Sequence, residues 1–144
     1  PAIAGYFKGK NIDLVLAPDA GASARAADVG EHMGIPHDHL EKIRLSGVDV
    51  RIAPAKMDCR GKNILIVDDI IATGGTIIAA TEQLKEAGAK SVTVACTHGV
   101  FVGNAVERLT GSNLDGIFCC NTLENKVSSI SVAPLIAAAL MEKE

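Results

Sequence analysis

Apolar residues along the chain form short continuous runs, and these runs alternate with segments that have the period of a helix. The runs predict buried strands at residues 12–18, 64–69, 91–99, 115–122 and 127–133. The segments between them predict helices at residues 23–33, 76–89, 104–111 and 133–143. Because such strands need cover on both faces of their sheet, the pattern predicts an α/β fold with a doubly wound parallel sheet in a single domain.

One segment, residues 43–61, has no regular pattern. It predicts either an antiparallel pair of short strands or a mobile loop. No internal repeat, low-complexity tract or linker is evident in the rest of the sequence. The first strong strand starts only at Ile12, without a strand–helix unit before it, so we expect the chain to be a piece of a longer protein.

The composition is that of a soluble globular protein, with 144 residues, 48% hydrophobic and 22% charged. A net charge of −3 without runs of one sign, and only 3% aromatic residues, argue against nucleic acid or a membrane surface as a partner. No apolar stretch reaches the ~18 residues of a membrane span, and the N-terminal residues lack the pattern of a secretory signal. Four cysteines without a Cys-x-x-Cys spacing predict reduced thiols in the cytoplasm.

The stretch NILIVDDIIATGGTIIAA, residues 63–80, contains the main candidate binding residues. An apolar strand ends at two adjacent acids, Asp68 and Asp69, and a glycine-containing turn then leads into a helix. Glycines let backbone N–H groups approach an anion, and the beginning of a helix adds partial positive charge. The turn is therefore predicted to bind a phosphate through Thr73, Gly74, Gly75 and Thr76.

Carboxylates repel a phosphate, but they accept hydrogen bonds from a vicinal diol. A ligand with a phosphate at one end and a diol nearby, such as ribose 5-phosphate, satisfies both halves of the motif. The Gly-Lys-Ser/Thr of a P-loop and the Gly-x-Gly-x-x-Gly of a dinucleotide site are absent from the sequence. In the alternative interpretation the acids merely end a strand and the glycines make a plain turn, but the ordered combination favours a sugar-phosphate site.

The stretch IVDDIIATGGTI resembles the phosphoribosyl pyrophosphate loop of type I phosphoribosyltransferases and of ribose-phosphate pyrophosphokinases. The stretches LAPDAGASARA, LEKIRLSG, GAKSVTVACTHGVF and SVAPLIAAAL resemble the pyrophosphokinases in particular. The resemblance covers nearly the whole chain and implies a type I phosphoribosyltransferase-like fold. It also implies that the chain is the C-terminal half of such an enzyme, and that an absent N-terminal domain supplies much of the ATP site.

The resemblance implies a Mg²⁺-dependent transfer of diphosphate from ATP to ribose 5-phosphate, with release of AMP. It assigns the ribose 5-phosphate loop to the two acids and the turn described above. Asp19 matches an acid that helps to hold Mg²⁺, and Lys42 and Arg44 match two basic residues of a catalytic loop that closes over the site. Cations at that position stabilise the charge that develops on the transferred group.

Two positions depart from the common family pattern, namely Ala72, where many members have Asp, and Ala22, where many have Gly. Arg25, early in its helix, is interpreted either as a phosphate contact or as a solvated helix charge. His98 follows a strand and either lines the site or is a hydrogen-bonded structural residue. His37 and His39 form a weak candidate metal pair, because no third ligand is evident.

Two other functions stay open on the sequence alone. A phosphoribosyltransferase that attaches a base would need a hood over the base, and no segment of the chain obviously provides one. A non-catalytic module that keeps the sugar-phosphate pocket is the second alternative. As partners we expect ribose 5-phosphate and ATP, together with either a homo-oligomer or association with the missing N-terminal domain.

Overall fold

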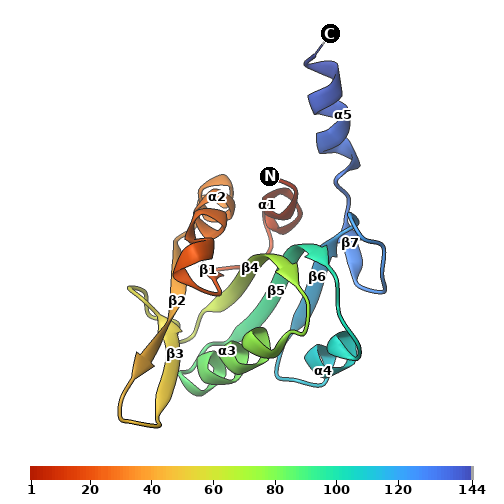
Figure 1. The fold of residues 1–144 in the computed structure, drawn as a ribbon. Coiled ribbons are helices and arrows are strands. Elements are labelled where there is room, and N and C mark those ends of the chain that lie inside the picture. The colour runs from red at the N-terminus through yellow and green to blue at the C-terminus, as the bar shows by residue number, and fades with distance from the viewer. Residues whose placement is uncertain (144) are drawn as a thin grey trace.

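A single seven-stranded sheet forms the centre of the computed structural model, which describes residues 1–143. The strands are β1 (Leu14–Ala17), β2 (His37–Arg44), β3 (Val50–Pro54), β4 (Asn63–Ile71), β5 (Ser91–Gly99), β6 (Gly116–Cys120) and β7 (Ser128–Ile130). Their order in the sheet is β3-β2-β1-β4-β5-β6-β7 (Figure 1). All neighbours run parallel except β3, which pairs antiparallel with β2 at one edge.

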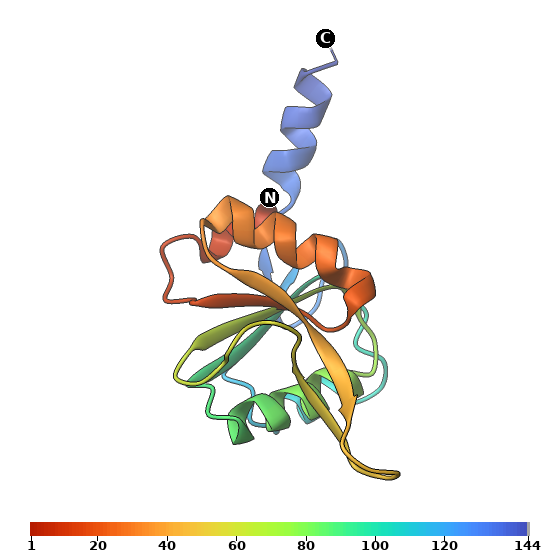
Figure 2. The same ribbon diagram turned by 90° about the vertical axis from the view of Figure 1, so that its left-hand side faces the viewer.

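Helices cover both faces of this sheet, as the alternating pattern predicts. They are α1 (Ala2–Phe7), α2 (Ser23–Met33), α3 (Gly75–Glu86), α4 (Ala105–Thr110) and α5 (Ala133–Met141), with a short 3₁₀ turn η1 (Ala20–Ala22) before α2. Helices α1 and α2 lie over one face and α3 and α4 over the other, whereas α5 stands away from the sheet (Figures 1 and 2). Within residues 1–143, none of the helices is both long enough and apolar enough to cross a membrane.

The core consists of two apolar layers, one on each face of the sheet. Although β1 and residues 64–67 of β4 are all apolar, their side chains alternate between the layers. Leu16 and Ile66 belong to the layer under α3, while Val15 and Val67 belong to the layer under α1 and α2. All four cysteines are free and buried, and burial raises the pKa of the Cys96 thiol to about 12, so that this thiol stays protonated.

The sequence predictions are confirmed for most elements. Helix α2 and strand β5 have the predicted bounds, and β4 is longer than predicted because its pairing with β5 continues to Ile71. Of the two alternatives for residues 43–61, the antiparallel pair is present, because the end of β2 pairs with β3. Helix α1 and the first half of β2 were not predicted from the sequence pattern.

Candidate active site

The turn between β4 and α3 is the predicted phosphate loop, and it runs from Ala72 to Gly74. Gly74 has a φ of +76°, and a Cβ atom there would lie 2.9 Å from the Leu109 side chain. Both the backbone conformation and the packing therefore require glycine at this position. At Gly75, by contrast, a Cβ atom would meet no described heavy atom within 4 Å, so the loop is open on that side.

The beginning of α3 presents free backbone donors at this opening. The first intrahelical hydrogen bond runs from the Ile78 amide to the Gly74 carbonyl oxygen, at 3.0 Å. Among the residues described, no side chain caps the helix. The preceding amides, those of residues 75–77, point out of the end of the helix, where an anion would accept from them.

The two acids lie within β4 rather than beyond its end, because the strand continues past them to Ile71. Asp68 accepts a hydrogen bond from the Asp69 amide at 2.8 Å, and Asp69 accepts one from the Ile70 amide at 2.8 Å. Asp69 Oδ2 also forms an ion pair with Nη2 of Arg25, which lies in the first turn of α2, at 2.6 Å. Arg25, which the sequence left as either a phosphate contact or a solvated helix charge, thus forms an ion pair with one of the predicted diol acceptors, and its role as a phosphate contact stays a prediction.

The environment separates the acidities of the two neighbouring carboxylates. Burial, together with the hydrogen bond and negative charge of Asp69, raises the pKa of Asp68 to about 6. Although burial opposes it, hydrogen bonds from Asp68 and the Ile70 amide, helped by the charge of Arg25, lower the pKa of Asp69. Near neutral pH Asp69 is therefore a firmly charged acceptor, whereas Asp68 takes up a proton in mildly acidic solution.

Asp19 lies in a hollow of about 530 Å³ that also includes Lys42 and Thr76. The Asp19 side chain caps η1, because its Oδ1 accepts a hydrogen bond from the Ala22 amide at 3.0 Å. Oδ2 makes no hydrogen bond among the described residues and is available to a ligand. The fold thus brings together a carboxylate, a cation and the beginning of the phosphate-loop helix, from three separate stretches of sequence.

The donor set in this hollow fits a magnesium ion that arrives with its substrate. Within residues 1–143 there is no group of three or more His, Cys, Asp or Glu side chains placed to hold a metal. Mg²⁺ commonly keeps several waters and binds through one or two carboxylates plus substrate phosphates, so it does not need such a cage. Asp19 supplies a carboxylate of the kind that this mode of binding requires, and Glu41 of β2 lines the same hollow.

Lys42 and Arg44 lie on a strand and not on the loop that the resemblance implies. Both belong to β2, where Lys42 is opposite Ile52 and Arg44 is opposite Val50 of β3. Because the two basic residues are two positions apart in a strand, they share one face of the hairpin. Both line a hollow of about 800 Å³ together with Gln83 of α3, and only Lys42 also reaches the hollow of Asp19.

The β2–β3 hairpin is exposed over residues 41–51 and is held at its base. The buried Asp38 carboxylate accepts hydrogen bonds from the amides of Lys56 at 2.7 Å and Met57 at 2.9 Å. These bonds and the nearby His39 lower the pKa of Asp38, although burial opposes the shift. The second fastening is a hydrogen bond from the Ile52 amide to Gln83 Oε1, which ties β3 to α3. No local sequence signal identifies Gln83, because its partner lies far away along the chain.

The candidate metal pair of His37 and His39 finds no support. His39 Nε2 lies 3.1 Å from Glu41 Oε1, and His37 Nε2 lies 4.0 Å from Glu31 Oε1. The acid between the two histidines, Asp38, is committed to backbone amides. These histidines make ordinary polar contacts along β2.

His98 is hydrogen-bonded within the protein. Thr122 Oγ1 donates to the Thr97 carbonyl oxygen at 2.8 Å, and His98 Nδ1 lies 2.8 Å from the same Oγ1. Because the hydroxyl proton is already used, Nδ1 must carry the hydrogen and donate it to Thr122. The structural interpretation of His98 therefore applies, and its Nε2 is left free of this network.

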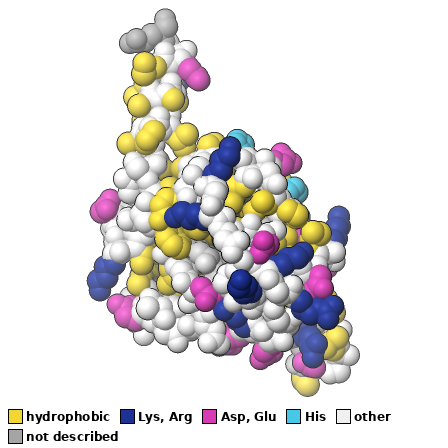
Figure 3. All heavy atoms as spheres, turned by 180° about the vertical axis from the view of Figure 1, so that it is seen from behind, with side chains coloured by type: hydrophobic (Ala, Val, Ile, Leu, Met, Phe, Trp, Pro, Cys, Tyr) yellow, Lys and Arg dark blue, Asp and Glu magenta, His cyan; other side chains and the backbone are white. Residues whose placement is uncertain are grey.

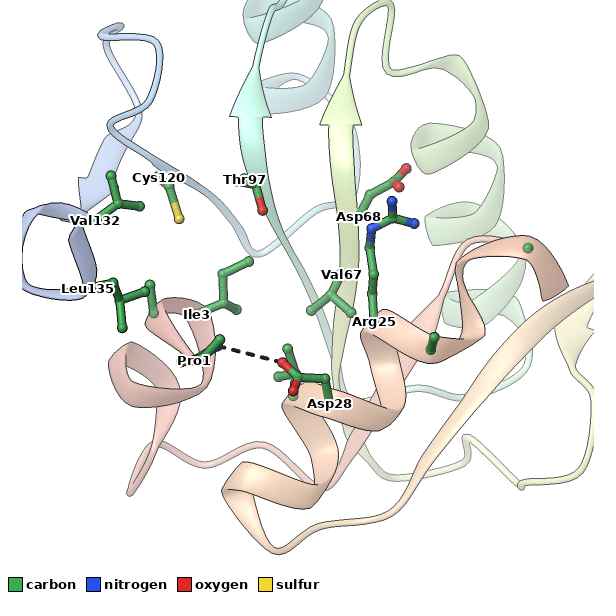
Figure 4. Close-up of a pocket in the computed structure, with 14 residues that line it drawn as sticks. Pro1, Ile3, Arg25, Asp28, Val67, Asp68, Thr97, Cys120, Val132 and Leu135 are labelled. Carbon is green, nitrogen blue, oxygen red and sulfur yellow. Dashed lines mark ion pairs between the residues drawn. The ribbon is translucent and has the colours of Figure 1, made fainter. Parts of the chain in front are cut away.

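A groove that the sequence did not predict lies between α1, α2 and the sheet (Figure 4). Its volume is about 650 Å³. Arg25 and Asp68 lie side by side at one end of it, and the rest is lined by apolar side chains, among them Ile3, Cys120 and Leu135, and by the polar side chains of Asp28 and Thr97. The groove thus extends from Asp68 and Arg25 to the apolar side chains beside α1.

The phosphoribosyl transferase domain model matches residues 2–134 of this chain. The chain belongs to that family, and its fold is that of a type I phosphoribosyltransferase-like domain. Within the family, the chain is 48% identical over 135 residues to the ribose-phosphate pyrophosphokinase of Pyrococcus furiosus, an alignment that covers 93% of this chain and 48% of the relative. The relative from Pyrococcus abyssi, with the same name, is 48% identical over 144 residues.

Solved structures agree with this assignment. The crystal structure of phosphoribosylpyrophosphate synthetase from Mycobacterium smegmatis superposes with a TM-score of 0.81 at 31% identity, covering 99% of this chain and 50% of that one. Adenine phosphoribosyltransferase from Giardia lamblia, at 19% identity and a TM-score of 0.67, shares the fold over 80% of this chain and 72% of its own. The chain spans about half the length of the pyrophosphokinase relatives that it matches.

Proposed function

We propose that this chain carries the ribose 5-phosphate site and the transferring cations of a ribose-phosphate pyrophosphokinase. The proposed reaction moves diphosphate from ATP to ribose 5-phosphate, giving phosphoribosyl pyrophosphate and AMP with Mg²⁺ as cofactor. The observation that carries the proposal is the hollow in which Asp19, Lys42 and Thr76 meet. The names of the relatives, which are ribose-phosphate pyrophosphokinases, support the same reaction.

The sugar phosphate is proposed to bind across the β4–α3 turn. The phosphate accepts hydrogen bonds from the amides and hydroxyls of residues 73–76, in the open space beside Gly75. The ribose diol donates to the carboxylates of Asp68 and Asp69. Asp69 suits this role, because its lowered pKa keeps it charged and Arg25 holds it in place.

In the transfer step the anomeric hydroxyl oxygen forms a bond to the β-phosphorus of ATP and loses its proton. The bond from that phosphorus to the bridging oxygen of the α-phosphate breaks, and AMP leaves with the bridging oxygen. Negative charge grows on the transferred group, and Lys42 and Arg44 stabilise it. The Lys42 ammonium acts as a point charge, whereas the planar Arg44 guanidinium can donate two parallel hydrogen bonds to phosphate oxygens. Mg²⁺, when bound at Asp19, supplies further charge to the diphosphate.

We propose that the nucleoside of ATP binds mainly to the part of the longer relatives that this chain does not span. The rings of Tyr6, Phe7 and Phe118 pack against one another, with centroids 5.1–5.5 Å apart, and Lys10 lies 3.6 Å from the centroid of the Tyr6 ring. Phe101 packs against the apolar core. Among the described residues, therefore, no aromatic ring stands free beside the hollow to stack on adenine.

Ribose 5-phosphate binding to the 144-residue chain tests the site by calorimetry. Gly75→Val should abolish binding, because its side chain fills the open space in the loop, and Asp69→Ala should weaken binding by removing a diol acceptor. Gly75→Ala is the matched control for the fold and should melt like the parent chain. Unchanged affinity in both Gly75→Val and Asp69→Ala would place the sugar phosphate elsewhere.

AMP formation then tests the reaction. We expect the chain alone to form little or no AMP from ATP and ribose 5-phosphate, and addition of the other half of a pyrophosphokinase relative to restore it. Pyrophosphate release from phosphoribosyl pyrophosphate with a panel of bases, without AMP formation in either mixture, would instead identify a base-transferring enzyme. Intact sugar-phosphate binding without any turnover would favour the non-catalytic module.

A further inference from the structure

The connection between β5 and α4, residues 100–104, runs beside the β4–α3 turn and binds its carbonyl groups. The Ile71 carbonyl oxygen accepts hydrogen bonds from the amides of Val100 and Phe101, at 3.1 and 3.0 Å. The Ala72 carbonyl oxygen accepts one from the Val102 amide, at 2.9 Å. The first two carbonyls along the turn therefore both face the β5–α4 connection.

The amides of the turn face the other way. A trans peptide directs its N–H opposite to its C=O, so carbonyls that face the β5–α4 connection turn the amides that follow them to the opposite side. Within residues 1–143, the amides of residues 72–74 donate no hydrogen bond. Because backbone donors are normally paired, a row of free amides is available to a ligand on that side.

The third carbonyl of the turn, that of Thr73, is bound by a side chain. Arg108 Nη1 of α4 donates to the Thr73 carbonyl oxygen at 3.5 Å. Within residues 1–143 the Arg108 guanidinium forms no ion pair, whereas that of Arg25 is paired with Asp69. On the face of the molecule seen in Figure 3, acidic and basic side chains are interspersed rather than gathered by sign, so cations there act through the groups that they contact.

Helix α4 is fixed against the turn next to Arg108. Leu109 is fully buried and occupies the space beside Gly74, where a Cβ atom would lie 2.9 Å from the Leu109 side chain. On the solvent side of the helix, Glu107 pairs with Lys126 at 3.8 Å. The contact of Leu109 with Gly74 therefore keeps the Arg108 side chain within reach of the peptide that precedes Gly74.

The β5–α4 connection is itself held in an unusual conformation. Phe101 has a φ of +45°, in the left-handed region that bulky side chains rarely occupy. Its ring packs against the apolar core and over Gly99, where no Cβ atom could be accommodated. A backbone of this kind persists only where its surroundings fix it, so the connection is a firm support for the turn.

We infer that Arg108 is a positioning residue of the phosphate loop: it holds the Thr73 carbonyl and so directs the Gly74 amide, at the other end of the same peptide, to the 5-phosphate. This inference rests on the proposed function, which supplies the phosphate. A positive charge beside the carbonyl oxygen also polarises the peptide and makes its N–H a stronger donor. Because Arg108 lies on the carbonyl side, it acts through the peptide and not by touching the phosphate.

Calorimetry with ribose 5-phosphate on the 144-residue chain tests this role. Arg108→Met keeps an unbranched side chain without its charge and donors, and should weaken binding roughly fivefold to tenfold. Lys126→Met removes the same charge beside α4 without touching the turn, and should change the affinity by less than about twofold. Arg108→Lys retains a charge and should bind more tightly than Arg108→Met. Because Arg108 and Lys126 are exposed, all variants should melt at the temperature of the parent.

The Gly74 amide provides a readout that needs no ligand. In the ligand-free chain, Arg108→Met should shift the Gly74 signal in the amide spectrum, because the peptide loses its partner, and Lys126→Met should leave it in place. Weaker binding without this shift would identify a direct contact with the phosphate and overturn the positioning role. Unchanged affinity in Arg108→Met, or equal losses in Arg108→Met and Lys126→Met, would also overturn it.

Failure of the proposed function is distinguishable from failure of this inference. A parent chain that does not bind ribose 5-phosphate would overturn the proposed function. The Gly74 signal would then still decide whether Arg108 holds the turn: a shift in Arg108→Met supports that role, and an unchanged signal overturns it. Binding that is lost in Gly75→Val but unaffected in Arg108→Met would overturn the inference alone.

Discussion

The phosphate loop and the β2–β3 hairpin face the same hollow but are built in opposite ways. The loop follows a central strand that pairs on both sides, and its Gly74 is wedged against Leu109. The hairpin lies at the edge of the sheet, exposed from residue 41 to residue 51, and is tied down through Asp38 and Gln83. The groups proposed to bind the sugar phosphate therefore lie in a turn that packing fixes, and the groups proposed to act on the transferred phosphates lie on an exposed hairpin at the edge of the sheet.

Because of this difference, we expect mutations to change the binding of the sugar phosphate and the rate of transfer separately. Changes in the loop should alter the fold or the affinity for the sugar phosphate. Changes in the hairpin should alter the rate and leave both of these intact, because rigid elements position ligands and mobile ones complete a site after binding.

The largest effect is expected for Lys42 in an active full-length enzyme that carries this domain. Lys42→Ala should lower kcat by ~10² or more, because a preorganised charge is lost from the transition state, and should leave ribose 5-phosphate binding unchanged. Arg51→Ala is the matched control: Arg51 lies on the same hairpin opposite Ile43, and therefore on the other face. Equal losses in the two variants, or none in Lys42→Ala, would contradict the role of that face.

The next effect concerns the rigidity of the loop. Gly74→Ala should lower the free energy of unfolding by about 2 kcal/mol or more, because alanine is strained at positive φ and its Cβ meets Leu109. Gly75→Ala should change it by less than about 0.5 kcal/mol, since the space there is open. Urea unfolding of both variants makes the comparison. Similar stability for the two would mean that the turn is soft, like the hairpin.

A smaller effect is expected where the hairpin is fastened to α3. Gln83→Ala removes the acceptor of the Ile52 amide, and should lower local stability by about 1 kcal/mol, so that this amide exchanges roughly fivefold faster. Glu82→Ala, at the exposed neighbouring position on α3, should leave the exchange rate as it is. If Ile52 exchanged at the same rate in both variants, the hairpin would be held by something other than Gln83.

The last effect is a pH dependence on the loop side. The pKa of Asp68 is raised from 3.8 to about 6 on folding, so its contribution to stability is fully present below pH 3.8 and is lost as the pH rises through about 6. The Asp68→Asn variant has no titrating carboxylate at this position, so its stability does not fall with pH through this group. The melting temperature of the variant relative to the parent should therefore rise by a few degrees across that window and then level off. A constant difference at all pH values would show that Asp68 is not buried as described.

The sequence predicted the elements that rest on local pattern. Helix α2 has an Ala-rich sequence and a left-handed Gly34 after its last residue, and its bounds were found as predicted. The continuous apolar run of β5 was equally clear. The glycine turn was predicted at residues 73–76 and is found at 72–74, because α3 begins at Gly75 and thus one residue earlier than predicted.

The elements that were missed rest on partners distant in sequence. The six residues of α1 are too few to form a helix on their own, and they do so by burying Ile3 and Phe7 against the sheet. The first half of β2 is polar, and it is a strand because it pairs with β1 while the Asp38 carboxylate is satisfied by amides. The ion pair of Arg25 with Asp69 likewise joins segments that no local pattern connects.

The continuity of β2 has a mechanical consequence. The strand is clamped beside β1 as far as His39 and by the buried side chain of Leu40, and from Glu41 to Arg44 it pairs with β3 alone, so it projects beyond this clamp at Leu40 without a break. At ~3.3 Å per residue, Lys42 lies roughly 7 Å and Arg44 roughly 13 Å beyond the clamp, and a bend of ~20° there would move them by about 2 Å and about 5 Å. The inner cation is thus confined to the hollow of Asp19, and the outer one sweeps an arc about twice as long.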